Sequence, residues 1–133
     1  RGAIARFDRG SIEIRVMDLQ ECPASDVALA ALVTTVLKHF SDAEYIAKHK
    51  LKEWHHLELR SIFDLVIKDA ELAHISNSKY LQALGLPDSE AKSKDVWKSL
   101  FNMVKAELAA EHVQTLSVLL DSGSLSTRIK QTK

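Results

Sequence analysis

A short segment near the start of the chain, residues 10–18, alternates apolar and charged side chains. It reads Gly-Ser-Ile-Glu-Ile-Arg-Val-Met-Asp. Successive side chains of a β-strand point to opposite faces, so the aliphatic residues share one face, and Glu13 and Arg15 share the other. The aliphatic residues are Ile12, Ile14 and Val16. We expect the apolar face to be buried and the charged face, with its carboxylate and guanidinium, to lie outward.

The residues around this strand predict a β-hairpin followed by a helix. Gly2–Phe7 and Ser11–Leu19 are β-prone runs, and the loop between them contains a glycine, as hairpin loops often do. Pro23 then ends the strand, because proline cannot donate to a ladder. Ser25 is a plausible N-cap for a helix that continues through Val27–Phe40. This helix is apolar around most of its circumference, so we expect it to be buried on more than one side and to pack across the sheet.

The rest of the chain has helical spacing of its apolar residues, interrupted by short polar breaks. The expected elements are a helix from the capping box at Ser41 to Lys50, a helical stretch over Leu51–Ile75, a short helix capped by Asn77 or Ser78 and ended by Gly85, a polar loop over Ser89–Lys94, helices over Asp95–Leu108 and Glu111–Leu120, and a last turn over Leu125–Ile129. The prediction is a mostly α, α+β fold in a single domain over residues 1–133. Its N-terminal β-hairpin (1–19) precedes about five or six helices over residues 25–133.

Composition narrows the class of protein. Of the 133 residues, 46% are hydrophobic and 27% charged, which is typical of a globular domain. Equal numbers of basic and acidic residues, 18 of each, argue against general nucleic-acid binding. The longest apolar run, Val27–Leu37, is too short to cross a membrane. The single cysteine, Cys22, is consistent with a reducing cytoplasm, and we expect its thiol to be inert.

The segment from Arg6 to Phe40 resembles the carboxylate–amine ligase branch of the glutamate–cysteine ligases. These enzymes carry a Glu-aliphatic-Arg-Val-x-Asp strand, matched here by residues 13–18, and then a loop and an apolar helix. The resemblance to glutamine synthetase, with its Ile-Glu-Val-Arg strand, is more distant. Later residues, including the run Lys68–Glu71, are compatible with the helical tail of the same ligases. The strand belongs to an antiparallel sheet in those enzymes, where it forms the floor of the active site.

This resemblance implies a function and a set of site residues. Glu13 and Asp18 would bind Mg²⁺ or Mn²⁺, and Arg15 would be the catalytic residue that contacts the phosphoryl group of ATP. The reaction would be ATP-dependent amide formation from small amino acids, as in glutathione biosynthesis, in the cytoplasm. These enzymes are several hundred residues long, so we expect the chain to be the C-terminal part of a longer ligase. By itself it would be inactive and bind no cofactor tightly.

Alternative interpretations remain for the same residues. Glu13 and Arg15 can form a solvated surface ion pair with no further role. An isolated two-stranded hairpin is marginal in water and leaves unpaired edges. We therefore expect it to pair with the remainder of the parent enzyme or with a second copy of the chain. The rival function is a non-catalytic helical interaction module whose hairpin adds to a partner's sheet.

The histidines and tryptophans carry weaker hypotheses. His55 and Glu58 have the spacing of metal ligands on a helix, but no His-Glu-x-x-His pattern is present, and a solvated surface is expected. Trp54 and Trp97 occupy apolar helical positions and are expected to anchor a core or an interface.

Overall fold

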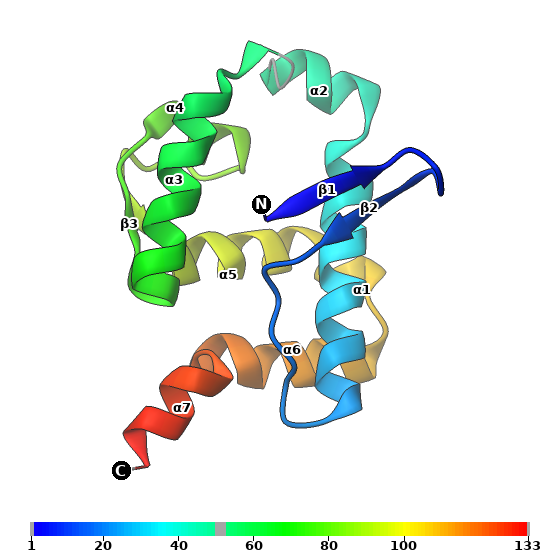
Figure 1. Ribbon diagram of the computed structural model, residues 1–133, viewed down its shortest axis with the longest axis vertical. Helices are drawn as coiled ribbons and strands as arrows, with labels where there is room; N and C mark the ends of the chain where they lie inside the picture. Colours follow the sequence, from blue (N-terminus) through cyan, green and yellow to red (C-terminus); the bar gives the residue numbers. More distant parts are fainter. Residues whose placement is uncertain (1, 50–52, 133) are drawn as a thin grey trace.

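The chain begins with a two-stranded antiparallel hairpin and continues in helices, which confirms the predicted fold class (Figure 1). The computed structural model describes residues 2–49 and 53–132. Strand β1 (Ala3–Arg6) pairs with β2 (Ser11–Ile14), and Ile4 lies opposite Glu13. The predicted hairpin is therefore correct, and its second strand is shorter than the sequence suggested.

Seven α-helices follow within the described residues, with two 3₁₀ turns and a second small sheet between them. They are α1 (Pro23–Phe40), α2 (Ala43–His49), α3 (His56–Asp69), η2 (Ala70–Leu72), β3 (His74–Ile75), α4 (Ser78–Ala83), β4 (Ala91–Lys92), α5 (Ser93–Val104), η3 (Lys105–Glu107), α6 (Ala110–Ser122) and α7 (Leu125–Gln131). The predicted end of a helix at Lys50 and the predicted start of the next at Leu51 lie outside the described residues.

Helix α1 begins earlier than its polar residues suggested. Pro23 is the first helical residue, and Cys22, not Ser25, is the N-cap. Proline suits this position because the first helical N–H groups have no intrahelical acceptor, so the one that proline lacks costs nothing. Ser25 is instead buried within the first turn.

Caps explain where two of the other helices begin. The carboxylate of Asp42 accepts the backbone N–H groups of Glu44 and Tyr45, so Asp42 caps α2 in place of the predicted Ser41. The side chain of Asn77 accepts the N–H of Tyr80 at the start of α4, so Asn77 is the cap of the two that the sequence offered. Gly85, with a φ of 80°, follows the end of that helix.

The second sheet is a feature that the helical spacing did not predict. The stretch expected to be helical up to Ile75 ends as a helix at Asp69, and β3 then pairs antiparallel with β4, His74 opposite Lys92. Ala70 at the junction has a φ of 49°, which breaks the helical path. The predicted loop over Ser89–Lys94 contains β4 and the start of α5.

The hydrophobic core lies among the helices. Helix α1 makes its most extensive contacts with α6 and α5, both of which lie across it in Figure 1. The largest side chains that are fully buried are Leu32, Leu81, Val104 and Leu116. Helix α1 buries one stripe, whereas Val27 and Leu37 on its other sides are about half exposed, so the expectation that it is buried on several sides was wrong.

The hairpin packs less closely and with the opposite orientation to the predicted one. Ile12 and Val16 are 65% and 54% exposed, and Ile14 is 37% exposed, so the apolar face of β2 is open to solvent. Ile4 and Glu13, on the charged face, are only partly exposed. The prediction that the apolar face is buried was therefore wrong: the described residues provide no layer that covers it.

A glycine allows the start of the hairpin to approach the helices. A Cβ atom on Gly2 would overlap the ring of Phe63 on α3. The absence of that atom lets the backbone before β1 lie against the aromatic ring. The end of the hairpin away from its turn therefore lies against α3.

The length and hydropathy of each helix show whether it could span a membrane. Among the described residues, no helix is both long enough and apolar enough to cross a bilayer.

Candidate functional site

Glu13 and Arg15, the strand residues predicted to form a site, lie together on the charged face of the hairpin. Glu13 belongs to β2, and Arg15 follows the last strand residue. The ladder still reaches Arg15, because its backbone N–H donates to the carbonyl oxygen of Gly2 over 2.9 Å. Both side chains therefore start from backbone that is hydrogen-bonded to β1 or to the residue before it.

Two arginines bind the carboxylate of Glu13, one at each oxygen. The Nε of Arg15 lies 3.2 Å from Oε1, and the Nη1 of Arg6 lies 3.2 Å from Oε2. Arg6 reaches Glu13 because the register sets Ile4 opposite Glu13, which places Arg6 at the diagonal position of the same face. The hairpin thus holds one carboxylate between two guanidinium groups.

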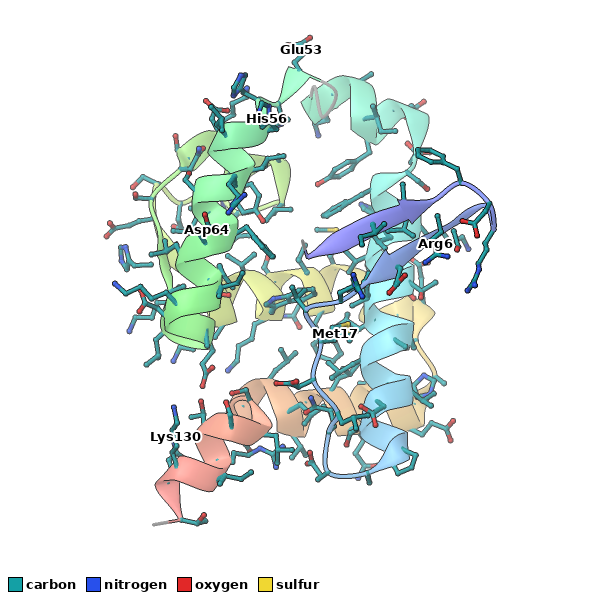
Figure 2. The ribbon with its side chains drawn as sticks, in the orientation of Figure 1. Arg6, Met17, Glu53, His56, Asp64 and Lys130 are labelled. Carbon is teal, nitrogen blue, oxygen red and sulfur yellow. The ribbon has the colours of Figure 1, made fainter. Side chains whose placement is uncertain are left out.

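The contacts continue from Arg6 to the turn. The Nε and Nη2 of Arg6 donate to the two carboxylate oxygens of Asp8 over 3.3 and 3.4 Å. The resulting chain of ion pairs, here named the charged row, consists of Asp8, Arg6, Glu13 and Arg15. Figure 2 shows Arg6 near the turn, whereas Met17 lies on the segment that leaves the other end of the hairpin. The row therefore runs from the turn towards that end.

Partial exposure limits what the charged row contributes to stability. The side chains of Arg6, Glu13 and Arg15 are 36%, 41% and 55% exposed. Ion pairs this open to water are typically worth less than ~1 kcal/mol each. The row is thus better suited to holding side chains in defined positions than to stabilising the fold.

Asp18, the third predicted site residue, is not part of the row. It lies in the irregular segment between β2 and α1, where its backbone carbonyl accepts the side-chain amide of Gln20 over 3.1 Å. The structure therefore brings Glu13 and Arg15 together and does not add Asp18 to them.

The donor set around Glu13 does not fit a divalent cation. Mg²⁺ and Mn²⁺ need several oxygen ligands, and each oxygen of Glu13 is already in an ion pair with a guanidinium group. Across residues 2–49 and 53–132, no three His, Cys, Asp or Glu side chains gather in a way that could hold a metal ion. The assignment of Glu13 and Asp18 as metal ligands stays a prediction that these residues alone do not support.

Sequence reasoning missed Arg6 and Asp8. Both precede the recognisable strand pattern, and their relation to Glu13 depends on the register of the hairpin. The register could have been inferred from a four-residue turn, Phe7–Gly10, which makes Arg6 and Ser11 partners. That pairing alone would have predicted the diagonal contact.

Cys22, His55 and Trp54, the other residues considered from the sequence, make contacts within the fold. Cys22 is exposed at the start of α1, where a hydrogen bond with the Ser25 hydroxyl lowers the pKa of its thiol. His55 caps α3 by accepting the N–H of Leu57, and its ring stacks on His56. Trp54 is partly buried edge-on to Tyr80.

Two shallow hollows lie elsewhere on the molecule, and no hairpin residue lines either of them. One, of about 530 Å³, adjoins the junction of α1 and α2. The other, of about 370 Å³, lies between η2 and α7. Beside the second, burial would raise the pKa of Glu71, but hydrogen bonds from Thr127 and Ser124 dominate and lower it. Both hollows are open and mix basic with acidic side chains, so neither defines a ligand.

Comparison with known proteins gives one informative similarity. In an alignment of 124 residues that covers 87% of the chain, it is 32% identical to an uncharacterized protein of Archaeoglobus fulgidus. The matched region makes up 32% of that protein, so the chain spans about a third of the length of the curated relative it matches. No protein-family model and no solved structure matches the chain.

Proposed function

We propose that this chain is part of an ATP-dependent carboxylate–amine ligase of the glutamate–cysteine ligase type. The Glu-Ile-Arg-Val-Met-Asp strand, the loop and the apolar helix that follows support the proposal, because they occur in the same order as in those ligases. The similarity to part of a longer archaeal protein is compatible with it. The remainder of such an enzyme would supply the ATP and amino-acid pockets, and its location would be cytoplasmic.

The proposed reaction has two steps. A substrate carboxylate oxygen attacks the γ-phosphorus of ATP and displaces ADP, which gives an acyl phosphate. An amine then attacks the acyl carbon, inorganic phosphate leaves, and the amine nitrogen loses a proton to give the amide. Both steps place negative charge on phosphoryl oxygens, so a fixed cation beside them lowers the barrier.

One observation carries the proposal: the anchored guanidinium of Arg15. Its Nε lies 3.2 Å from the Glu13 carboxylate in an ion pair, and its two terminal nitrogens donate no hydrogen bond to the described residues. An arginine held in this way presents a planar pair of donors that matches two oxygens of a phosphoryl group. Mg²⁺ normally accompanies ATP in such reactions, and Glu13 and Asp18 alone would not complete its coordination, so further ligands would come from the rest of the enzyme.

Turnover of the protein from the complete open reading frame tests the proposal. We expect ADP release with ATP, Mg²⁺ and a mixture of amino acids, and release should depend on the amine. Arg15→Ala should lower this turnover by roughly a hundredfold, because one phosphoryl-stabilising donor is lost. Arg9→Ala is the matched control, since Arg9 lies in the same hairpin and its ion pair is with Asp8. Full turnover in Arg15→Ala would remove Arg15 from the reaction.

A second function, a non-catalytic interaction module, is favoured by a different observation. The apolar face of β2 is exposed, and one edge of β2 has no partner strand among the described residues. Such an edge can accept a strand from another protein. An open reading frame product near 15 kDa that binds a partner and releases no ADP would favour this function over the ligase.

A further inference from the structure

We infer that Glu13 is a positioning residue for an oxyanion-binding Arg15, and that Arg6 completes this arrangement. The inference rests on the proposed function for the identity of the oxyanion, a phosphoryl group. It differs from the ligase resemblance in the role of Glu13, because the resemblance implies that Glu13 binds a metal ion. The juxtaposition that carries it is the charged row on one face of the hairpin.

The contacts of Glu13 explain the positioning role. A carboxylate has two oxygens, and here each lies 3.2 Å from a different guanidinium group: Oε2 accepts a hydrogen bond from Arg6, and Oε1 forms an ion pair with Arg15. Arg6 holds one oxygen, which fixes the plane of the carboxylate. The other oxygen then fixes the Nε of Arg15 and so limits how its long side chain can rotate.

Arg6 is itself restrained, which is why the row extends beyond one pair. Two of its nitrogens donate to Asp8 and a third donates to Glu13. Arg6 therefore has few donors left for a ligand, whereas the Arg15 guanidinium donates no hydrogen bond to the described residues and is held by its ion pair with Glu13. The asymmetry assigns the ligand contact to Arg15 and the supporting role to Arg6.

The charge balance of the row favours an anion as the ligand. Asp8, Arg6, Glu13 and Arg15 cancel one another, and Arg9 beside Asp8 leaves the hairpin with one net positive charge. The end of the row is a guanidinium that is 55% exposed, so a ligand can reach it without displacing a packed side chain. A phosphoryl group or a carboxylate has the planar pair of oxygens that such a guanidinium recognises.

Phosphate binding without metal tests the inference on the protein from the complete open reading frame. Titrating ATP in the presence of EDTA, by calorimetry, measures oxyanion affinity when no divalent cation is available. We expect Arg15→Ala to weaken binding by roughly tenfold, the loss of one charge-assisted contact. Arg15→Lys should also weaken it, because lysine keeps the charge but loses the fork and the Nε anchor.

Glu13→Gln is the decisive variant. Removing a negative charge near an anion site raises affinity if only net charge matters, whereas a positioning role predicts that ATP affinity falls. Asp18→Asn removes the same charge a few residues away without altering the row, so it reports the effect of net charge alone. Weaker binding in Glu13→Gln than in Asp18→Asn supports the inference. Equal or tighter binding in Glu13→Gln, or no ATP binding by the unaltered protein, overturns it.

Manganese binding separates the positioning role from the metal-ligand role. In Mn²⁺ titrations followed by electron paramagnetic resonance, Glu13→Gln should bind the ion as the unaltered protein does if Glu13 only positions Arg15. A loss of Mn²⁺ binding in Glu13→Gln overturns the inference. The turnover assay tests the proposed function separately. If the variants bind ATP as expected but the protein shows no amine-dependent ADP release, the inference about Glu13 is supported and the proposed ligase function is contradicted.

Discussion

The helices and the hairpin differ in how far their apolar side chains are buried. Helices α1, α5 and α6 each bury a set of aliphatic side chains, including Leu32 and Leu116, which are almost wholly inaccessible to water. On the hairpin, the apolar face of β2 is open, and Phe7 at the turn is 93% exposed. The helices therefore complete a core among themselves, and the hairpin does not share in it.

The accessible surface of the whole chain is also larger than its mass predicts. A folded monomer of 14.9 kDa is expected to expose about 7,000 Å² of accessible surface, whereas this chain exposes 9223 Å². The difference, about 2,200 Å², is larger than one partner's share of a standard protein interface. An alternating pattern specifies a strand, but the burial of its apolar face depends on a covering layer that the described residues lack.

The largest effect should come from the helical core. Leu116→Ala should destabilise the protein by about 2–5 kcal/mol, because it removes buried methyl groups and leaves a cavity. Urea unfolding followed by circular dichroism measures this. Val118→Ala, on the same helix but 58% exposed, is the control and should change stability little. Similar losses in both variants would mean that α6 does not pack as described.

A helix cap should have an intermediate effect. Asn77→Ala removes the acceptor for the Tyr80 N–H at the start of α4 and should cost about 1 kcal/mol. The same unfolding experiment detects it. Asn77→Asp keeps an acceptor and should restore most of the loss; no difference between the two variants would argue against the cap.

Changes on the apolar face of the hairpin should have a smaller effect on stability. Ile12→Glu combined with Val16→Glu should alter the free energy of unfolding by less than ~1 kcal/mol, because both side chains are already more than half exposed. The same double variant should lower the fluorescence of a bound hydrophobic dye. Val118→Glu, at an exposed site on α6, should leave dye binding almost unchanged. A large loss of stability in the double variant would show that this face is covered.

The smallest effect on stability should come from the ion pair between α7 and the segment before α1, and this effect should depend on pH. A hydrogen bond from Arg128, at 2.8 Å, lowers the pKa of Glu21 below its ordinary value. Because the pKa of Glu21 is lower in the folded state than in the unfolded state, its ion pair stabilises the fold at pH values above the unfolded-state pKa. This stabilisation is lost as the pH falls through the folded-state pKa. NMR titration of the Glu21 carboxylate should show its pKa rise in Arg128→Ala. Lys130→Ala should leave that pKa unchanged, and an unshifted value in Arg128→Ala would exclude the ion pair.

The sequence predicted the elements better than their surroundings. The hairpin, the cap at Asn77 and the stop at Gly85 follow from local chemistry, which acts within a few residues. The pairing of β3 with β4 depends on residues about seventeen positions apart, and no local pattern reports it. In the candidate site, Glu13 and Arg15 were recognisable from alternation. The contact of Arg6 with Glu13 could be predicted only from the register of the hairpin. The exposure of the apolar face could not be predicted without knowing which other elements pack against it.

The packing of α1 has a consequence for synthesis of the chain. Helix α1 is complete by Phe40, but its main neighbours, α5 and α6, begin at Ser93 and Ala110. On the ribosome its buried stripe would therefore have no partner until most of the chain has emerged. Contacts so distant in sequence slow folding and prolong the exposure of apolar surface. The first helix to be made is thus among the last to be enclosed, and it is the segment for which a chaperone would matter most.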